Sequence, residues 1–285
     1  MHSADAMTGG TDHPGPGLPL PLTGRTSLYA ILGDPIAQVG SPALFNAAFR
    51  ARRWEAALVP MHVKATGLMT VLAGLRRIEN LRGIVLTTPH KTAALDYVDE
   101  HGPEARLVGS INAIRCESGG RWYGENFDGL GCVTGIRAAG HRVEGKTVLV
   151  VGTGGAGRAV AAAIARHAPA LLRLHDIDLE RADTLRTSLA AAVPGILVET
   201  GSADPEGFQV VINCTPLGMA TTPGTSVDPA RLEQGTLVVD LVVEPIMTEL
   251  LAAAAARGCP VLPGRHTLRG QVDAVCEFFE GAGDG

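Results

Sequence analysis

The sequence predicts an α/β fold with two domains: an N-terminal α/β domain and a C-terminal Rossmann domain built on a doubly wound parallel sheet. A chain of 285 residues suits about two domains. Residues 147–151 form an apolar run without alternation, which is typical of a parallel strand buried on both faces. Strand and helix patterns then alternate from residue 146 to residue 262, as expected for a doubly wound sheet.

The chain divides into four expected segments. Residues 1–24 are rich in Pro, Gly, Thr and Asp and lack the basic start and apolar run of a secretory signal, so we expect a disordered tail. Residues 25–128 are expected to form the N-terminal domain and residues 129–263 the Rossmann domain. Residues 264–285 are expected to form a terminal amphipathic helix.

The composition argues against several kinds of partner. The net charge is −5 with both signs interspersed, so no basic stripe points to nucleic acid or to an anionic membrane. No apolar segment approaches the length that spans a bilayer. The five cysteines are scattered, with no CxxC pair and no spacing typical of metal ligands. They are interpreted as reduced, mostly buried thiols of a cytoplasmic protein that holds no metal.

The first strand of the second half ends in a glycine motif that predicts a dinucleotide site. Gly152 allows a tight turn, Gly154 lets a pyrophosphate approach the backbone, and Gly157 lets helix and strand pack closely. The motif passes into residues 159–165, a run of helix formers, and the free N–H groups and positive dipole end of that helix favour an anion. The prediction is specific because a strand precedes the motif and a helix follows it.

A second predicted strand, residues 171–175, ends at Asp176. This aspartate lies about 20 residues beyond the glycines, where a ribose-binding acid is expected. Asp176 could also cap the helix that begins at Leu179, and the two roles are compatible.

The rest of the Rossmann half follows the same alternation. The expected elements are a helix at 179–192, strands at 196–200, 209–213 and 236–243, a helix at 247–257 and a short strand at 260–262. Thr215 lies in the polar loop after the strand at 209–213. Such a loop, at the carboxyl end of a parallel strand, is where α/β sheets bind ligands.

The N-terminal half also alternates. Its expected elements are strands at 27–32, 56–63 and 83–86, helices from 42 to 53 and from 66 to 77, and a strand beyond residue 108 that leads to a hairpin turn at 119–120. Pro42 suits the first helical position, and Ser41 is then the natural N-cap. Alternatively, the Ser41 hydroxyl contacts a substrate, because it lies at a helix start beside a strand end.

Lys91 falls in the first turn of a helix that Pro89 opens and that Thr87 or Thr88 caps. A cation there opposes the helix dipole, so Lys91 is not placed for helix stability. It is either a solvated surface lysine or a catalytic ammonium whose pKa is lowered by the dipole and by partial burial. Asp128 is similarly open to two interpretations, because it could simply cap the next helix.

Taken together, the motifs resemble those of the shikimate dehydrogenase family. The matches occur in order over nearly all of the chain after the tail. They are Gly33-Asp34-Pro35-Ile36, Ser41-Pro42 with Asn46, Thr87-x-Pro89-x-Lys91, Gly109-x-x-Asn112, Gly124-x-Asn126-x-Asp128-Gly129, Gly152-x-Gly154-Gly155-x-Gly157, Asn213-x-Thr215-Pro216-Leu217-Gly218-Met219, Pro245-x-x-Thr248 and Gln271.

The resemblance implies a two-domain enzyme of the shikimate pathway of aromatic amino acid biosynthesis. It would transfer a hydride reversibly between a nicotinamide cofactor and a ring carbon of a shikimate- or quinate-type hydroxy acid. Residues 25–128 would bind and convert the substrate, and residues 129–263 would bind the cofactor. The final helix would return to the substrate domain, and the enzyme would be a monomer or a homodimer.

The resemblance also implies roles for individual residues. Lys91 would exchange a proton with the reacting oxygen, and Asp128 would orient Lys91 and bind a neighbouring hydroxyl. Other contacts to the substrate would come from Ser41, near the carboxylate, and from Thr87, Asn112 and Gln271, near hydroxyls. The expected cofactor-binding residues are Gly152, Gly154, Gly155, Ala156, Gly157, Asp176, Thr215, Leu241 and Gly264.

Four positions depart from the family pattern, each by replacing a polar residue with an apolar one. Val39 stands in place of a serine, Val85 of an asparagine, Val243 of a tyrosine and Phe127 of a threonine. Each lost hydrogen bond to a substrate would cost about 0.5–1.5 kcal/mol. The sequence therefore predicts a divergent member that binds shikimate or quinate weakly, or that takes a related ring with fewer hydroxyls or an added apolar group.

The cofactor is expected to be NAD, with NADP as the alternative. Family members that use NADP generally carry Asn-Arg-Thr where this chain has His175-Asp176-Ile177. An aspartate binds ribose hydroxyls and repels a 2′-phosphate. Arg173 and Arg181 lie nearby and keep NADP in consideration.

Two rival functions are less well supported. A small-molecule sensor that kept the fold and lost the chemistry would not need Lys91, Asp128 and an intact glycine motif, and no DNA-binding segment accompanies them. A dehydrogenase of another Rossmann family would lack the matches at Asn126 and Gln271.

Overall fold

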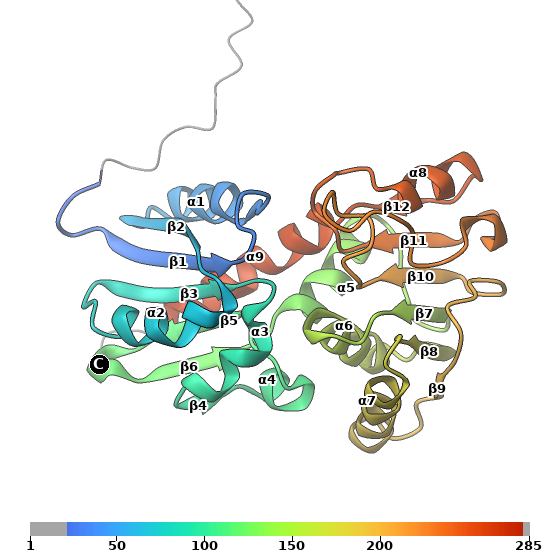
Figure 1. Ribbon diagram of the computed structural model, residues 1–285, viewed down its shortest axis with the longest axis horizontal. Helices are drawn as coiled ribbons and strands as arrows, with labels where there is room; N and C mark the ends of the chain where they lie inside the picture. The colour runs from blue at the N-terminus through green and yellow to red at the C-terminus, as the bar shows by residue number, and fades with distance from the viewer. Residues whose placement is uncertain (1–21, 282–285) are drawn as a thin grey trace, which may run out of the picture.

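The computed structural model describes residues 22–281 and contains two six-stranded sheets (Figure 1). The first is built from the N-terminal half of the chain and the second from the C-terminal half. The expected disordered tail lies almost entirely outside the described residues. Within residues 22–281, no helix is long and apolar enough to cross a membrane.

The first sheet is mixed, with the strand order β2-β1-β3-β5-β6-β4. Its strands are β1 (Ser27–Gly33), β2 (Ala56–His62), β3 (Leu81–Leu86), β4 (Glu100–His101), β5 (Ala113–Cys116) and β6 (Trp122–Glu125). The pairs β1–β2 and β1–β3 are parallel, whereas β5 is antiparallel to both β3 and β6. The expected hairpin joins β5 to β6 through Gly119 and Gly120, both at positive φ.

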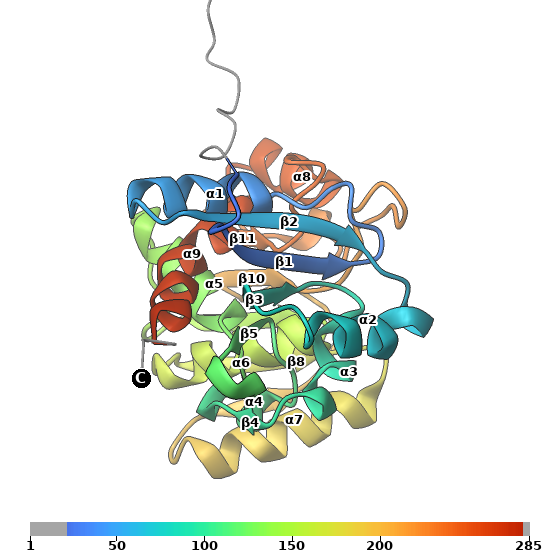
Figure 2. The ribbon, with the colours of Figure 1, turned by 90° about the vertical axis from the view of Figure 1, so that its left-hand side faces the viewer.

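Helices cover both faces of this sheet, because side chains alternate along each strand. Tyr29 and Ile31 of β1 pack against α1 (Ser41–Ala51) and α9 (Arg265–Glu280). Ala30 and Leu32 pack on the other face, against α2 (Leu68–Leu75). Figure 2 shows α1 and α9 on one side of the sheet and α2 on the other. The short helices of this half are α3 (His90–Ala93), α4 (Pro103–Val108), η1 (Ala65–Gly67), η2 (Leu95–Tyr97) and η3 (Ser118–Gly120).

The second sheet is entirely parallel, with the order β12-β11-β10-β7-β8-β9. Its strands are β7 (Thr147–Val151), β8 (Leu171–His175), β9 (Val198–Thr200), β10 (Val210–Asn213), β11 (Leu237–Asp240) and β12 (Val261–Leu262). The helices α5 (Asp128–Ala138), α6 (Gly155–Arg166) and α7 (Leu179–Ala192) cover one face, and α8 (Glu249–Ala256) with η4 (Pro229–Arg231) covers the other. The predicted α/β class with a doubly wound second sheet is confirmed.

Several predicted helix starts are wrong by one or more residues. Ser41 is the first residue of α1 and not its cap, since Gly40 occupies the cap position without a side-chain hydrogen bond. Neither Thr87 nor Thr88 caps α3, which begins only at His90, whose N–H donates to the Thr87 carbonyl.

The helices α5 and α7 also begin differently from the prediction. Asp128 is the first residue of α5 and not its cap. The cap of α7 is Asp178, whose side chain accepts from the Arg181 N–H, so Asp176 does not cap it. Asp128 and Asp176 are therefore not explained as helix caps.

Glycines bring α5 and α9 into backbone contact between the two sheets. A Cβ built on Gly270 would lie 2.3 Å from the Gly131 carbonyl oxygen, and one on Gly135 would lie 2.6 Å from the His266 carbonyl oxygen. On the opposite side of α5, a Cβ on Gly129 would lie 2.1 Å from the Ala159 carbonyl oxygen of α6. Since these obstacles are backbone atoms, no rotamer change relieves them.

We predict that Gly270→Ala destabilises the protein by about 1–3 kcal/mol, because the added methyl group forces α5 and α9 apart. Urea unfolding followed by circular dichroism measures the change. Gly74→Ala in α2 is the matched control, since a Cβ there meets nothing within 4 Å. It should be neutral or stabilising by up to about 1 kcal/mol, through higher helix propensity. Equal stability of the two variants would contradict the packing argument.

Candidate active site

A cavity of about 410 Å³ opens between the two sheets. It lies beyond the carboxyl ends of strands from both sheets, where open α/β sheets bind ligands. Its lining includes every residue predicted to be catalytic or to contact the substrate, namely Ser41, Thr87, Lys91, Asn112, Asp128 and Gln271. Of the predicted cofactor residues, it includes Gly154, Gly155, Ala156, Thr215, Leu241 and Gly264.

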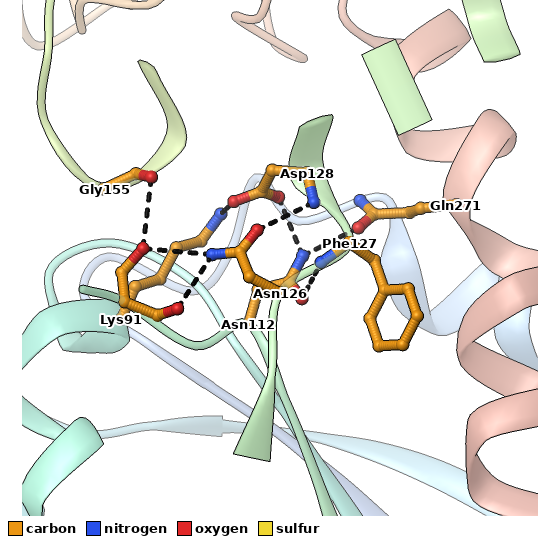
Figure 3. Close-up of polar contacts among 8 residues, drawn as sticks. Lys91, Asn112, Asn126, Phe127, Asp128, Gly155 and Gln271 are labelled. Carbon is orange, nitrogen blue, oxygen red and sulfur yellow. Dashed lines mark hydrogen bonds and ion pairs between the residues drawn. The ribbon is translucent and has the colours of Figure 1, made fainter. Parts of the chain in front are cut away.

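Lys91 and Asp128 form an ion pair at the centre of this cavity (Figure 3). Lys91 Nζ donates to Asp128 Oδ2 at 2.5 Å, and the side chains are 16% and 7% exposed. Lys91 is therefore not a solvated surface lysine. An ammonium and a carboxylate held this far from water interact more strongly than the same pair on a surface.

The second oxygen of Asp128 is held by an amide network. Asn112 Nδ2 donates to Asp128 Oδ1 and to Gln271 Oε1, both at 2.8 Å. Asn112 Oδ1 accepts from the Phe127 N–H at 2.9 Å. Asn112 lies in the loop before β5, Phe127 and Asp128 lie at the start of α5, and Gln271 lies on α9, so the network joins segments far apart in the sequence. Gln271 is buried and is not an ordinary exposed helical residue.

Ser41 and Thr87 line the cavity from the side of the first sheet. Ser41 is buried and is the first residue of α1. Thr87 directly follows β3, and its N–H donates to the Leu32 carbonyl of β1 at 3.0 Å. Both hydroxyl groups therefore lie at the carboxyl ends of the central strands or beside them.

Three of the four apolar replacements form one apolar part of the cavity wall. Val39, Val85 and Val243 all line it. Phe127 does not: its ring packs against Phe278 at 5.3 Å between centroids and points away from the ion pair (Figure 3). The position of Phe127 therefore removes no polar group from the cavity, in contrast to the expectation from sequence.

The glycine loop between β7 and α6 fits a bound pyrophosphate. Gly152 adopts φ +92°, and a Cβ on Gly157 would lie 1.9 Å from the Gly152 carbonyl oxygen, so both positions require glycine. A Cβ on Gly154 would meet nothing within 4 Å, which leaves open space in front of the α6 N-terminus. The first N–H groups of α6 face that space and suit an anion.

Asp176 is buried beneath this loop and braces it. Its Oδ2 accepts from the Thr153 N–H and hydroxyl at 2.7 and 2.8 Å, and its Oδ1 accepts from the Asp178 N–H at 2.9 Å. Burial raises the pKa of Asp176, but these hydrogen bonds and the nearby Arg181 outweigh it and leave the pKa lower than usual. The carboxylate therefore stays ionised and fixes the loop through Thr153.

A second carboxylate, missed in the sequence, lies next to Asp176. Asp178 is half exposed, and Arg181 bridges the two acids at 3.8 Å from Asp176 and 3.1 Å from Asp178. Ile177 between them is 98% exposed. The end of β8 thus presents two acids and one paired arginine. The sequence signal that could have identified Asp178 is its spacing, two residues after Asp176 at the end of the same strand.

The other cofactor-side residues lie on loops after β10, β11 and β12. Thr215 Oγ1 donates to Asn213 Oδ1 at 2.7 Å, and the Leu241 N–H donates to the Asn213 carbonyl at 3.0 Å. Gly264 lies against Leu241, because a Cβ there would be 2.5 Å from the Leu241 carbonyl oxygen. Asp240 supports these loops.

Asp240 is fully buried and accepts hydrogen bonds from Asn213, Thr248 and the Val242 N–H. Its burial outweighs these bonds and raises the pKa of its carboxyl group. Asn213 and Thr248 are motif residues in the sequence, but the motifs alone do not predict this contact with Asp240.

Comparison with known proteins agrees with this architecture. A family profile described as "Shikimate dehydrogenase substrate binding domain" matches residues 31–114. The shikimate dehydrogenase (NADP(+)) of Geobacter sp. strain M21 is 33% identical over 269 residues, which cover 92% of each chain.

Three solved structures share the fold. A shikimate dehydrogenase in complex with NADP+ gives a TM-score of 0.82 at 27% identity, covering 91% of this chain and 92% of the other. Quinate dehydrogenase from Corynebacterium glutamicum in complex with NAD gives 0.78 at 30% identity, covering 90% and 94%. Ligand-free 5-ketofructose reductase of Gluconobacter sp. gives 0.77 at 27% identity, covering 91% and 94%.

The sequence identity extends over nearly the full length of both chains, and the fold, the glycine loop and the buried lysine–aspartate pair accompany it. The chain belongs to the shikimate dehydrogenase family.

Proposed function

We propose that this protein transfers a hydride reversibly between a nicotinamide cofactor and a secondary alcohol or ketone carbon of a shikimate- or quinate-type cyclic hydroxy acid. The observation that carries the proposal is the position of the Lys91–Asp128 pair directly opposite the glycine loop. A Cβ on Gly155 would lie only 3.6 Å from Lys91 Cβ. A substrate bound at Lys91 is therefore adjacent to a cofactor bound at the loop.

A nicotinamide cofactor held at the glycine loop would supply the hydride acceptor or donor, and this chain's own residues would move the proton. When the alcohol is oxidised, the Lys91 ammonium first releases a proton to solvent, and neutral Nζ then takes the hydroxyl proton as the carbon–hydrogen bond breaks and the ketone forms. In the reverse direction the Lys91 ammonium returns that proton to the oxygen and stabilises its developing negative charge. Asp128 orients Nζ through the 2.5 Å hydrogen bond.

The remaining assignments are part of the same proposal, and the positions of the residues around the cavity support them. Residues 25–128 act as the substrate domain, residues 129–263 as the cofactor domain, and the terminal helix carries Gln271 to the substrate. Thr87, Asn112 and Gln271 bind hydroxyl groups, and Ser41 contacts the carboxylate. The glycine loop, Asp176, Thr215, Leu241 and Gly264 contact the cofactor or shape its site.

NAD is the proposed cofactor, with NADP used less well. Asp176 and Asp178 place negative charge where a 2′-phosphate would lie, and Arg181 is already paired with both. The arginine therefore does not offer a phosphate an unpaired cation. Both carboxylate oxygens of Asp176 already accept hydrogen bonds from the protein. Asp176 therefore favours NAD through its negative charge and through its hold on the glycine loop.

The proposed location is the cytoplasm, and the proposed assembly is a monomer or a homodimer. The five cysteines are all free thiols, which suits a reducing compartment.

The proposed activity predicts oxidation of shikimate or quinate with NAD and a loss of at least about 100-fold in kcat for Lys91→Ala, since the proton acceptor is removed. Initial rates of NADH formation measure both. Lys64→Ala, at an exposed lysine outside the cavity, is the control and should keep full activity. Wild-type activity in Lys91→Ala would refute the assignment of Lys91.

We predict that Ile177→Arg improves kcat/KM for NADP at least about tenfold, because an exposed cation there can pair with the 2′-phosphate. The ratio of kcat/KM for NAD and NADP is measured for both proteins. Leu197→Arg, at another exposed apolar position, controls for added charge. A wild-type protein that already prefers NADP would contradict the interpretation of the two aspartates.

Because Val39 and Val85 line the cavity, we predict that Val39→Ser and Val85→Asn each lower the KM for shikimate by about two- to tenfold. The reason is that each restored polar group can form a hydrogen bond with a substrate oxygen. Steady-state kinetics with shikimate and quinate measure the change. Val59→Ser, on the exposed part of β2, is the control. A rise in KM for both variants would contradict this prediction and would favour a substrate that presents an apolar face to Val39 and Val85.

A further inference from the structure

Ser110 bridges the two halves of the molecule at the active site. It lies in the loop between α4 and β5 and is fully buried. Its Oγ donates to the carbonyl oxygen of Gly155 at 3.2 Å. Gly155 is the first residue of α6 and belongs to the glycine loop of the second sheet. The hydroxyl group thus reaches from the proposed substrate side to the proposed cofactor side.

The same hydroxyl is linked to the helix that begins with Asp128. Asn126 Nδ2 donates to Ser110 Oγ at 3.0 Å and to the Ser110 carbonyl at 3.2 Å. Asn126 Oδ1 in turn accepts from the Asp128 N–H at 3.0 Å. An unbroken series of hydrogen bonds therefore runs from the glycine loop to the start of α5. All its members are buried or lie at the cavity wall.

The loop that holds Ser110 also contacts the other member of the ion pair. The N–H of Ile111 donates to the Lys91 carbonyl at 2.9 Å. A Cβ on Gly155 would lie 3.5 Å from Ser110 Cβ and 3.6 Å from Lys91 Cβ, so the three residues pack together. A shift of the glycine loop would therefore displace groups that contact Lys91 and groups that contact the first turn of α5, where Asp128 lies.

We propose that Ser110 is a positioning residue that couples occupancy of the glycine loop to the geometry of Lys91 and Asp128. The inference rests on the proposed function, because it takes the glycine loop as the cofactor site. When the cofactor orders this loop, the Gly155 carbonyl holds the Ser110 hydroxyl. Ser110 then fixes Asn126 and, through it, the first turn of α5. Ser110 touches neither reacting atom in this account and acts through its two partners.

Such coupling is a free energy shared by the two sites, and it acts equally in both directions. In Ser110→Ala the Gly155 carbonyl loses its donor from the substrate side, while Asn126 keeps its hydrogen bond to the Ser110 carbonyl. The first turn of α5 should remain folded but should no longer respond to the loop. One neutral hydrogen bond corresponds to about a three- to tenfold effect.

Hydrogen exchange with and without NADH tests the coupling without needing the substrate. In the wild type, NADH should slow amide exchange in the glycine loop, residues 152–158, and also in residues 126–131. In Ser110→Ala the loop should still be protected, whereas the NADH-dependent slowing at 126–131 should fall by about three- to tenfold. Ser188→Ala is the control, because Ser188 also donates to a backbone carbonyl, that of Thr184, on an exposed helix surface.

The outcomes separate this inference from the proposed function. Protection of the glycine loop without protection at 126–131 in the wild type, or equal protection there in Ser110→Ala, overturns the coupling and leaves the cofactor site standing. No protection of the glycine loop in the wild type refutes the cofactor site and the coupling together. A second readout is kcat with shikimate or quinate: Ser110→Ala should lower it about three- to tenfold with an unchanged melting temperature.

Discussion

The close contact between α5 and α9 is the constraint on which the active site depends. The site lies between two sheets that share no strand, so their relative position must be fixed elsewhere. Backbone-to-backbone packing at Gly131 and Gly270 fixes it without intervening side chains. Asp128 begins one of these helices and Gln271 lies on the other. The contact that holds the sheets together therefore also sets the distance between two groups at the ion pair.

The ion pair itself is stabilised by the groups around it. Removing two charges from water is costly, and their mutual attraction repays the cost only when the remaining hydrogen-bonding capacity is satisfied. Lys91 and Asn112 occupy one carboxylate oxygen each, and Asn112 is in turn fixed by Gln271 and the Phe127 N–H. The network keeps a mostly buried charged pair in the cavity wall, while part of Lys91 remains available to a ligand.

Most of the fold could be predicted from the sequence, because buried parallel strands are apolar throughout and the glycine motif has few alternatives. The helix starts at Ser41, His90 and Asp128 could not be placed as well. Side-chain preferences suggested caps there, whereas Gly40 takes the cap position of α1, the His90 N–H donates to the Thr87 carbonyl, and the Asp128 N–H donates to the Asn126 side chain. Contacts between residues far apart in the sequence could not be predicted either. Nothing in the sequence around Phe127 indicates that its ring packs against Phe278 and not in the cavity.

The candidate site shows the same division. Motif residues such as Lys91, Asn112 and Gln271 are found around one cavity, as the resemblance implied. The buried contacts of Asp176 with Thr153, and of Ser110 with Gly155, left no pattern in the sequence, because each joins segments at least 20 residues apart. The sequence around Ser110 does not indicate that its hydroxyl group contacts Gly155.

The glycine contact between α5 and α9 also limits how the molecule can move. Two helices that touch through their backbones cannot slide along each other, because each carbonyl fits beside a particular glycine. They can still rotate slightly about their line of contact. Any opening of the cavity is therefore a hinge motion whose axis runs through α5 and α9. Admission of a ligand by such a motion changes the angle between the sheets and leaves their register intact.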